Sequence, residues 1–576
     1  MGLAVNVLER LRTAFGAVTP EGGDADAFKS AVRATNDPKF GDYQANGCMA
    51  LAKSLKVNPR VLASQVADAV DLEPLAGPPE IAGPGFLNVR LHDAWMARSL
   101  ADLLGAGFPG IVPPAQPRTV VIDFSSPNVA KPMHVGHIRS TVIGNSLARI
   151  FEALGHHVIR DNHLGDWGSQ FGMILWGWKN ARDEAAFAAD PVAELARLYR
   201  LAQDRIKAGD RSVEVAARAE TAKLHAGDAE NRALWNQFMP HCLQALRKIY
   251  ARLGVRFDVE LGESFYDPML ASVVADVSAK GIAEESEGAI VVFTAETPAP
   301  FIIRKRDGAF NYGTTDLATI KYRAETWNPQ QILYVVDHRQ GDHFRQLFAV
   351  ARRWGYDQVD LEHVAFGTIL GADRRPFKTR EGDAVGLESL LDEAVSEARK
   401  VVDANSPDLD QEARARVAEV VGLGAIKYAD LSQNRLSDYV FDWQKMLAMN
   451  GNTATYLQYA YARIQSIFSK GEIDPRTLRN QPPELVLNHP AERGLGVRIL
   501  RLPEVLELAA AELKPNILTD YLFDLANAFS TFFEECPVLK AESASRRDSR
   551  LAICDLTAQT LKFGLELLGI EVIDRM

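Results

Sequence analysis

Few cysteines and no long apolar run occur in this sequence, and these absences exclude several classes of protein. The four cysteines are scattered without a Cys-x-x-Cys pair, which argues against a zinc knuckle or a disulfide framework and favours a reducing, cytoplasmic setting. No apolar run approaches the roughly 18 residues of a membrane span, so no membrane association is expected. The first apolar segment contains Glu9, Arg10 and Arg12 and lacks the pattern of a signal peptide.

Several catalytic motifs are also missing. The sequence contains no GxxxxGKS/T phosphate loop, no GxSxG nucleophile elbow and no HExxH zinc motif. His338 and His343 are poorly spaced for a shared metal, so no metal ligands are assigned. The net charge of −11 does not by itself indicate nucleic acid, although an acidic protein can have a locally basic surface. Bulk composition therefore leaves RNA binding open.

One stretch carries a specific signal: Asp123 to Arg139, with the sequence DFSSPNVAKPMHVGHIR. The β-branched run 119–122 before it predicts a buried parallel strand. After it, apolar residues recur at three- and four-residue spacing from Ile143 to Leu154, which predicts a helix. The order is therefore strand, loop, helix, with HVGH at or near the helix start.

The HVGH segment suits a phosphate. A helix N-terminus offers unpaired N–H groups and a positive dipole end. Gly136 lets a nucleotide approach the backbone closely because it has no Cβ. His134 and His137 fall on one face of the first turn and can both donate to phosphate oxygens. On these four residues alone, a helix cap with two histidines satisfied by backbone carbonyls remains an alternative.

The longer string SPNVAKPMHVGH resembles the HIGH signature of class I aminoacyl-tRNA synthetases, and its flanks are similar to those of arginyl-tRNA synthetases. The resemblance spans the whole chain. It implies an α/β catalytic domain with a doubly wound parallel sheet of Rossmann type, an N-terminal α+β domain and a C-terminal all-α helical bundle. The alternation of strand and helix patterns after Asp123 independently predicts the doubly wound parallel sheet.

Three domains are predicted from the resemblance and the sequence pattern. They are an appended tRNA-contacting domain at 1–110, a catalytic domain at 111–445 with a helical insertion at about 180–252 and stem helices at about 387–445, and a helical anticodon-binding domain at 446–576. A basic cluster near the end, Arg546, Arg547 and Arg550, is equally compatible with a solvated helix start and an RNA contact.

Amino-acid activation is attack by a carboxylate on the α-phosphorus of ATP, so the protein supplies positioning and charge stabilisation rather than a nucleophile. The segment PFKTREG at 376–382 resembles the KMSKS loop of the family in a degenerate form, although a solvated basic loop is an alternative. The resemblance implies Lys131, His134, His137 and Lys378 for catalysis, and His134, Gly136, His137, Lys378 and Arg380 for ATP binding. Lys131 is similar to a lysine that compensates for an imperfect loop in arginyl enzymes.

The amino-acid pocket must recognise a guanidinium, a planar group with five donors and no acceptor. The resemblance implies contacts to arginine from Asp123, Ser126, Asn128, His137, Tyr312, Asp316 and Gln340. Ser126 and Asn128 match the α-amino end, and Tyr312 and Asp316 match the side-chain pocket. Asp123 stands where some relatives have Glu, which leaves open whether it contacts arginine directly or through water. Thr314 or Thr315 is predicted to cap the helix that contains Asp316.

These features predict an arginine–tRNA ligase that activates L-arginine with ATP and transfers it to the 3′ end of tRNA(Arg). ATP enters with Mg²⁺ as a substrate, no tightly bound metal is expected, and a cytoplasmic monomer is predicted. The resemblance also implies that tRNA must bind before the adenylate forms. A silent tRNA-binding paralogue is an alternative, but it would be expected to lose a signature histidine or a pocket acid. A cysteinyl enzyme would need zinc-ligating cysteines, which four scattered ones do not provide.

Overall fold

The computed structural model describes residues 6–35, 37–106, 108–377, 385–406 and 408–576. The chain divides into two compact units. One contains Pro114–Leu447, and the other joins Met1–Pro113 with Ala448–Met576. No helix among the described residues combines the length and the apolar character that a bilayer crossing needs.

A parallel sheet of five strands is the centre of the first unit, in the order β12-β11-β5-β6-β7. The strands are β5 (Thr119–Asp123), β6 (His157–Leu164), β7 (Val259–Gly262), β11 (Gln331–Tyr334) and β12 (Asp360–His363). Val120, Val121 and Ile122 of β5 are fully buried, which explains why this strand has a continuous apolar run instead of an alternating pattern.

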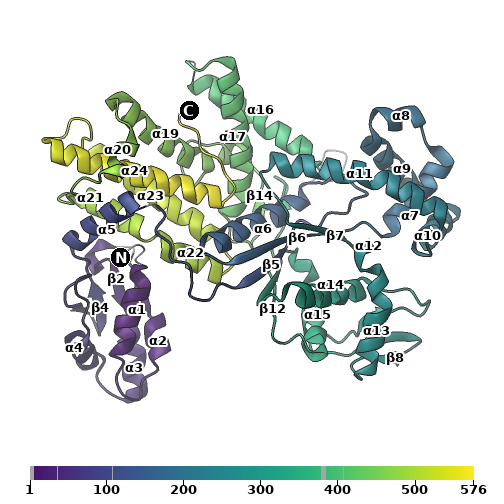
Figure 1. The fold of residues 1–576 in the computed structure, drawn as a ribbon, viewed down its shortest axis with the longest axis horizontal. Coiled ribbons are helices and arrows are strands. Elements are labelled where there is room, and N and C mark those ends of the chain that lie inside the picture. Colours follow the sequence, from purple (N-terminus) through teal and green to yellow (C-terminus); the bar gives the residue numbers. More distant parts are fainter. Residues whose placement is uncertain (1–5, 36, 107, 378–384, 407) are drawn as a thin grey trace. The chain divides into compact units, whose positions relative to one another are not determined.

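Helices cover both faces of this sheet (Figure 1). Helix α6 (Gly136–Ala153) follows β5 and lies on one face. Helices α13 (Leu270–Ala279), α14 (Tyr312–Trp327) and α15 (Gly341–Trp354) pack on the face to which Val121 contributes. The strand order reverses between β5 and β11, and parallel sheets bind ligands outside the carboxyl ends of the strands at such a point. The predicted doubly wound fold is confirmed.

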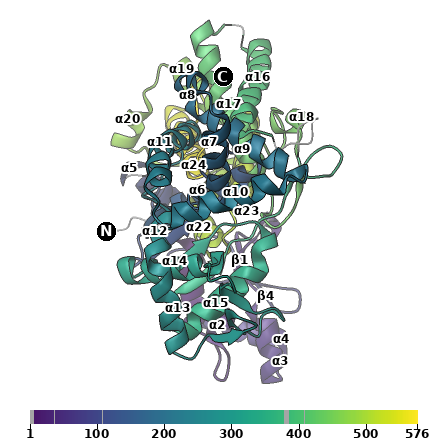
Figure 2. The same ribbon diagram turned by 90° about the vertical axis from the view of Figure 1, so that its right-hand side faces the viewer.

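Other elements of the first unit surround the sheet. Between β6 and β7 the chain forms α7 (Ser169–Ala181), α8 (Glu184–Ala189), α9 (Pro191–Lys207), α10 (Arg211–His225) and α11 (Ala229–Arg252), and α7 to α10 gather into one bundle in both views (Figure 2). A small antiparallel sheet contains β8 (Glu284–Ser286), β9 (Ala289–Val292) and β10 (Phe301–Arg304). The remaining elements are α12 (Glu263–Tyr266), α16 (Leu387–Asn405), α17 (Gln411–Leu431), α18 (Trp443–Met446), and the paired strands β13 (Ile369–Leu370) and β14 (Tyr439–Val440).

The second unit combines an α+β part with a bundle of helices. Its antiparallel sheet has the order β1-β2-β4-β3, from β1 (Val32–Ala34), β2 (Tyr43–Ala45), β3 (Glu80–Ala82) and β4 (Phe86–Val89). Its helices are α1 (Val7–Ala17), α2 (Ala25–Ser30), α3 (Gly47–Leu55), α4 (Pro59–Ala69), α5 (Asp93–Ala106), α19 (Ala454–Gly471), α20 (Pro475–Asn480), α21 (Pro490–Leu500), α22 (Leu502–Ala511), α23 (Asn516–Glu535) and α24 (Ala544–Leu567). Arg493 of α21 binds Asp42 through two bonds of 2.8 and 2.7 Å, which joins the α+β part to the bundle.

The predicted cap of α14 is wrong. The helix begins at Tyr312, so Asn311 occupies the N-cap position. Thr314 is fully buried in the first turn, and its hydroxyl donates to the carbonyl oxygen of Ile303 in β10. The threonine therefore joins the helix to the neighbouring small sheet, a tertiary contact that local sequence does not reveal.

Candidate active site

The loop that follows β5 turns sharply at Ser125 and Ser126. Their φ angles of 71° and 44° lie in the left-handed region, which residues other than glycine rarely adopt. The Ser125 N–H donates to Ser140 Oγ over 2.8 Å, and the Ser126 N–H donates to Asn162 Oδ1 over 3.1 Å. The Ser125 and Tyr250 hydroxyl oxygens also lie 2.8 Å apart. Contacts from α6, β6 and α11 therefore hold this strained turn in place.

The turn positions the residues that are predicted to bind the α-amino end of arginine. The Ser126 hydroxyl donates to Asp123 Oδ1 over 2.8 Å. The Gly165 N–H, which follows β6, donates to the Pro127 carbonyl oxygen over 3.1 Å. A Cβ on Gly165 would lie only 3.3 Å from Asn128 Cα, so glycine permits this close approach. The loops after β5 and β6 thus fix Ser126 and Asn128 at the carboxyl edge of the sheet.

The two signature histidines lie at the start of α6 with ring centroids 4.1 Å apart. The Gly136 N–H donates to His134 Nδ1, and the His134 N–H donates to His137 Nδ1, each over 3.1 Å. In the tautomer in which both Nδ1 atoms accept, each neutral ring carries its proton on Nε2, whereas in the other tautomer of His137 its Nδ1 donates to the His134 carbonyl oxygen over 3.2 Å. A Cβ on Gly136 would lie 2.9 Å from His134 Cε1, so the glycine makes room for this ring. The pair can therefore present two uncharged N–H donors to a phosphate.

Burial lowers the pKa of both histidines from the usual 6.5, and the Lys131 charge lowers it further. The pKa of His137 falls to about 4, with His134 as the second cause after burial. Because the folded state keeps His137 neutral, its contribution to stability is present above pH 6.5 and is lost as the pH falls toward 4. Lys131 itself places Nζ 4.8 Å from the centre of the Tyr199 ring in α9.

The lysine loop of the predicted ATP site is only partly described. Lys378 and Arg380 lie outside the described residues. The Phe377 N–H, just before them, donates to a carbonyl oxygen of β13 over 3.0 Å. After them, the Val385 carbonyl oxygen accepts from the Val135 N–H over 2.9 Å. The chain that follows this loop therefore returns directly to the HVGH segment.

Arg139 connects α6 with the strand that pairs with β13. It is buried, its Nε lies 3.0 Å from Asp430 Oδ2, and its Nη1 donates to the Ser437 carbonyl oxygen over 3.0 Å. Its guanidinium also lies 5.3 Å from the centre of the Tyr439 ring in β14. Burial raises the pKa of Asp430, and the Arg139 charge opposes this rise. The histidine helix α6 and α17 thus share one buried ion pair, and the ring contact joins α6 to β14 as well.

A buried cluster of charges lies at the end of β5 and in the carboxyl half of β6. Arg323 of α14 donates from Nη2 to Asp123 Oδ2 over 2.6 Å and from Nε to Asp161 Oδ2 over 2.9 Å. Burial raises the pKa of Asp161, and the Arg323 charge opposes this rise. Both oxygens of Asp123 are engaged, one by Arg323 and the other by Ser126. Asp123 therefore joins α14 to the serine turn.

We expect Arg323→Met to destabilise the protein by about 3–5 kcal/mol, because two buried carboxylates lose their cation. Arg352→Met, at an exposed position of α15, is the matched control and should change stability by less than about 0.5 kcal/mol. Denaturant unfolding followed by tryptophan fluorescence compares the two. A loss below about 1 kcal/mol for Arg323→Met would contradict the stabilising role of this cluster.

The residues predicted for the side-chain pocket lie in the first turn of α14 and just before α15. Tyr312 begins α14 and is 62% exposed, and Asp316 is half-buried one turn further along. His343, in the first turn of α15, places Nε2 2.6 Å from Asp316 Oδ2. Gln340 is exposed in the turn just before α15. The structure thus adds a histidine to the two residues of α14.

Two further carboxyl groups, those of Glu263 and Asp166, lie within electrostatic range of this region. Burial raises the pKa of Glu263, His163 opposes this rise, and the charges of Asp166 and Asp316 add to it. Burial also raises the pKa of Asp166, whose carboxylate accepts from the Ser264 N–H over 2.9 Å and from its hydroxyl over 2.6 Å. A bound cation would relieve the repulsion that the charges of Asp166 and Asp316 exert on the Glu263 carboxyl group.

Known families match along the chain. The family described as tRNA synthetases class I (R), catalytic domain, matches residues 110–443. The arginyl tRNA synthetase N terminal domain matches 4–91, and the DALR anticodon binding domain matches 457–576. The chain belongs to the arginyl-tRNA synthetase family. The family and the arginine–tRNA ligase predicted from the sequence are confirmed.

Individual relatives of this family align over nearly the whole chain. An arginine–tRNA ligase of Rhodopirellula baltica is 42% identical over an alignment 649 residues long, gaps included. The alignment covers 95% of this chain and 96% of the relative. One of Salmonella arizonae is 46% identical over 571 residues, covering 97% and 98%. The crystal structure of arginyl-tRNA synthetase from Plasmodium falciparum covers 100% of both chains with a TM-score of 0.84 and 28% identity.

The DALR domain contains a cavity of about 640 Å³ next to α19. Aromatic and basic side chains mix in its lining, which includes Tyr459, Arg463, Lys470, Phe533 and Lys540. The Arg463 guanidinium lies 4.0 Å from the centre of the Phe533 ring, and Tyr459 is 40% exposed. Such a mixture is typical of sites where unpaired bases stack.

The basic cluster at the start of α24 is engaged within its own domain. Arg550 is buried and donates to Glu492 over 2.7 Å. Arg546 pairs with Glu542 over 3.2 Å, and Arg547 pairs with Asp548 over 3.1 Å. For Arg550, the structure therefore favours a stabilising role over an RNA contact.

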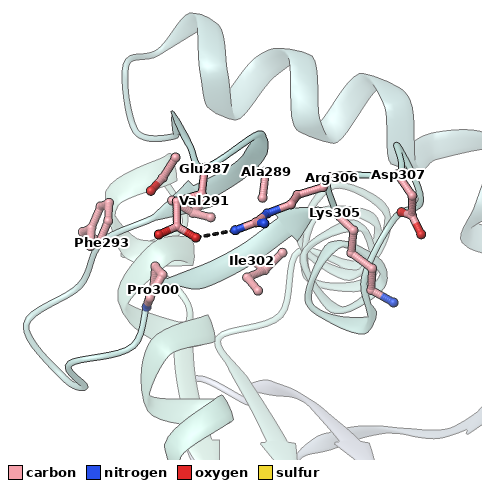
Figure 3. Close-up of a pocket in the computed structure, with 10 residues that line it drawn as sticks. Glu287, Ala289, Val291, Phe293, Pro300, Ile302, Lys305, Arg306 and Asp307 are labelled. Carbon is pink, nitrogen blue, oxygen red and sulfur yellow. Dashed lines mark hydrogen bonds and ion pairs between the residues drawn. The ribbon is translucent and has the colours of Figure 1, made fainter.

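A second cavity, of about 660 Å³, lies on the small sheet (Figure 3). Val291, Phe293 and Ile302 supply apolar lining, and an ion pair between Arg306 and Glu287 crosses it. Among the described residues, none predicted to bind ATP or arginine lines this cavity, so it is separate from the candidate active site.

Sequence reasoning missed Arg323, Asp161, Glu263 and His343 as parts of this site. One signal was available for two of them, because Asp161 lies in β6 toward its carboxyl end and Glu263 directly follows β7. Arg323 lies seven residues after Asp316, a spacing that keeps both on one side of α14. Among the described residues, no three His, Cys, Asp or Glu side chains gather in a way that suits a metal ion.

Proposed function

We propose that the carboxyl edge of the parallel sheet joins L-arginine to tRNA(Arg) through an arginyl-adenylate. The observation that carries the choice of arginine is the set of neighbouring carboxyl groups, in which burial first, and then the charges of Asp166 and Asp316, raise the pKa of Glu263. A cationic side chain relieves this repulsion, whereas a neutral amino acid does not. The guanidinium is favoured over an ammonium because its planar fork matches fixed carboxylate oxygens.

In the first step, a carboxylate oxygen of arginine attacks the α-phosphorus of ATP. A new P–O bond forms, the bond to the bridging oxygen breaks, and pyrophosphate leaves with the electron pair. His134 and His137 donate from Nε2 to phosphate oxygens where negative charge develops. Their lowered pKa keeps them neutral donors at neutral pH. Lys131, Lys378 and Arg380 act on the phosphates as cations, and Mg²⁺ enters with ATP as part of the substrate.

In the second step, the hydroxyl oxygen of the terminal ribose of the tRNA attacks the carbonyl carbon of the adenylate. An ester bond forms, AMP leaves with the electron pair, and the hydroxyl proton passes to the leaving phosphate. The protein again supplies no covalent intermediate. Ser126 and Asn128 hold the α-amino end of arginine through both steps, and Asp123 acts on arginine through the Ser126 hydroxyl that it binds.

Arginine's side chain lies between α14 and α15 in this proposal. Asp316 accepts from the guanidinium, Tyr312 covers it from the exposed side, and Gln340 offers an amide oxygen. Glu263, directly after β7, adds a further carboxyl group near this side chain. Together these residues provide carboxylate and amide oxygens in fixed directions, as a planar donor group requires.

The cavity in the DALR domain is proposed to take an unpaired base of the tRNA. Tyr459→Ala should weaken tRNA binding by about 1–3 kcal/mol, because one stacking face is lost. The KM for tRNA in charging should rise while the KM for arginine stays within about twofold. Leu508→Ala, at a residue of α22 that is 51% exposed and outside this cavity, is the control. An unchanged KM for tRNA in Tyr459→Ala would rule out stacking at this position.

The direct test of the proposed function is the charging of purified tRNA(Arg) with labelled arginine. The expected product is an alkali-labile arginyl ester that forms only with ATP. The assay includes tRNA from the start, because the family resemblance implies that tRNA precedes adenylation. No product with active control tRNA would overturn the proposal. We further propose that the enzyme acts as a monomer in the cytoplasm.

A further inference from the structure

His343 is an ionisable side chain that contacts Asp316 of the proposed guanidinium site and that the mechanism above does not use. Its Nε2 lies 2.6 Å from Asp316 Oδ2, a short contact in which the ring N–H donates to the carboxylate. The side chains of His343 and Asp316 are 11% and 27% exposed. The contact is therefore largely shielded from water. Hydrogen bonds and charges act more strongly in such a shielded place than in water.

The His343 ring is held from several sides. It stacks on Phe301 of β10 at 5.7 Å with 23° between the planes. Tyr312 meets it edge-on at 4.8 Å, and Phe344 does so at 5.3 Å. A Cβ on Gly313 would lie 2.6 Å from the Phe301 ring, so this glycine lets the first turn of α14 lie against the stack. The imidazole thus has little freedom to rotate.

We infer that His343 is a positioning residue for guanidinium recognition, and this inference rests on the proposed function. By engaging Oδ2, the imidazole fixes the plane of the Asp316 carboxylate and directs the remaining acceptor positions into the pocket. Through its ring contact, it also sets the place of Tyr312. A guanidinium needs such fixed directions, because two N–H groups of a rigid plane must meet two lone pairs together. An ammonium rotates freely and needs them less.

The alternative is a purely structural role, in which His343 only stabilises the packing of α15 on α14. The two roles make different predictions. Loss of a structural residue would raise the KM values for ATP and arginine alike, and its effect would add to that of removing Asp316. A positioning residue acts on arginine alone, and it has no effect once Asp316 is gone, because double-mutant effects are not additive within one interacting pair.

His343→Phe separates these roles, since the phenyl ring keeps the stack with Phe301 and Tyr312 but cannot donate to Asp316. The measurement is steady-state ATP–pyrophosphate exchange in the presence of tRNA(Arg). We expect the KM for arginine to rise about tenfold or more, with the KM for ATP and the kcat within about threefold of wild type. His343→Gln, which retains an N–H donor, should recover most of this loss. His157→Phe, at an exposed site at the start of β6, should match wild type.

The cycle with Asp316→Ala completes the test. In that background, His343→Phe should change the KM for arginine by less than about twofold. Equal rises in the two KM values, or an additive loss in the double variant, would overturn the positioning role. If the wild-type enzyme showed no ATP–pyrophosphate exchange with arginine, the proposed function itself would be overturned. The two failures are therefore distinguishable. A His343→Phe variant with wild-type KM values would leave the proposed function intact and refute this inference alone.

Discussion

Asp316→Ala is expected to weaken arginine binding by about 2–5 kcal/mol, which corresponds to roughly 30- to 5,000-fold. The loss is large because a half-buried guanidinium would then lack its carboxylate partner. Part of the measured cost comes from His343, whose ring N–H would also lose its acceptor. Calorimetric titration with arginine, in the presence of tRNA(Arg) and without ATP, measures the change.

Two comparisons make this result specific. Asp316→Asn keeps the size and one acceptor oxygen but removes the charge, so it should fall between wild type and Asp316→Ala. Asp342→Ala removes an exposed acid from the same turn of α15 as His343 and should bind arginine as wild type does. Normal arginine binding by Asp316→Ala would show that the pocket lies elsewhere.

His137→Ala should lower the rate of adenylate formation on the order of 10²-fold or more, as for the loss of one preorganised donor to a developing charge. The fold should remain, because the ring is partly exposed at the start of α6. Adenylate formation is followed by pyrophosphate exchange at saturating ATP and arginine. The KM for ATP should change less than the rate, since the donor acts mainly in the transition state.

The neutral state of His137 predicts which substitution should restore part of the rate. Burial and its neighbours hold its pKa at about 4, so the ring is an uncharged donor at pH 7. His137→Asn, with a neutral N–H₂ donor, should therefore recover part of the rate, whereas a role as a cation would not be rescued. His157→Ala is the control for loss of a histidine outside the site. An unchanged rate in His137→Ala with normal ATP dependence would remove this residue from the mechanism.

Local sequence predicted those parts of the site that depend on one element. The run 119–122 reveals a strand buried on both faces, and HVGH lies at the start of α6 as its pattern indicates. Tyr312 and Asp316 are four residues apart, so a helix alone places them on one face. The family resemblance supplied their roles, which remain predictions for this chain.

The parts that sequence could not reveal depend on contacts between distant segments. Arg323 reaches Asp123 and Asp161 only because the sheet places β5 beside β6 and α14 packs on their shared face. His343 meets Asp316 across the first turns of two different helices, α15 and α14. The spacing of residues within one helix cannot predict such contacts between distant segments.

The central claim is that this site selects arginine. The most direct measurement is ATP–pyrophosphate exchange with each standard amino acid in turn, in the presence of tRNA(Arg), with lysine and citrulline as the critical comparisons. Lysine carries the charge without the planar fork, and citrulline has nearly the shape without the charge. The account predicts rapid exchange with arginine and at least about 10³-fold weaker kcat/KM for both analogues, because buried partners would be left unpaired. Exchange with lysine, citrulline or any other amino acid at a rate near that of arginine would contradict it.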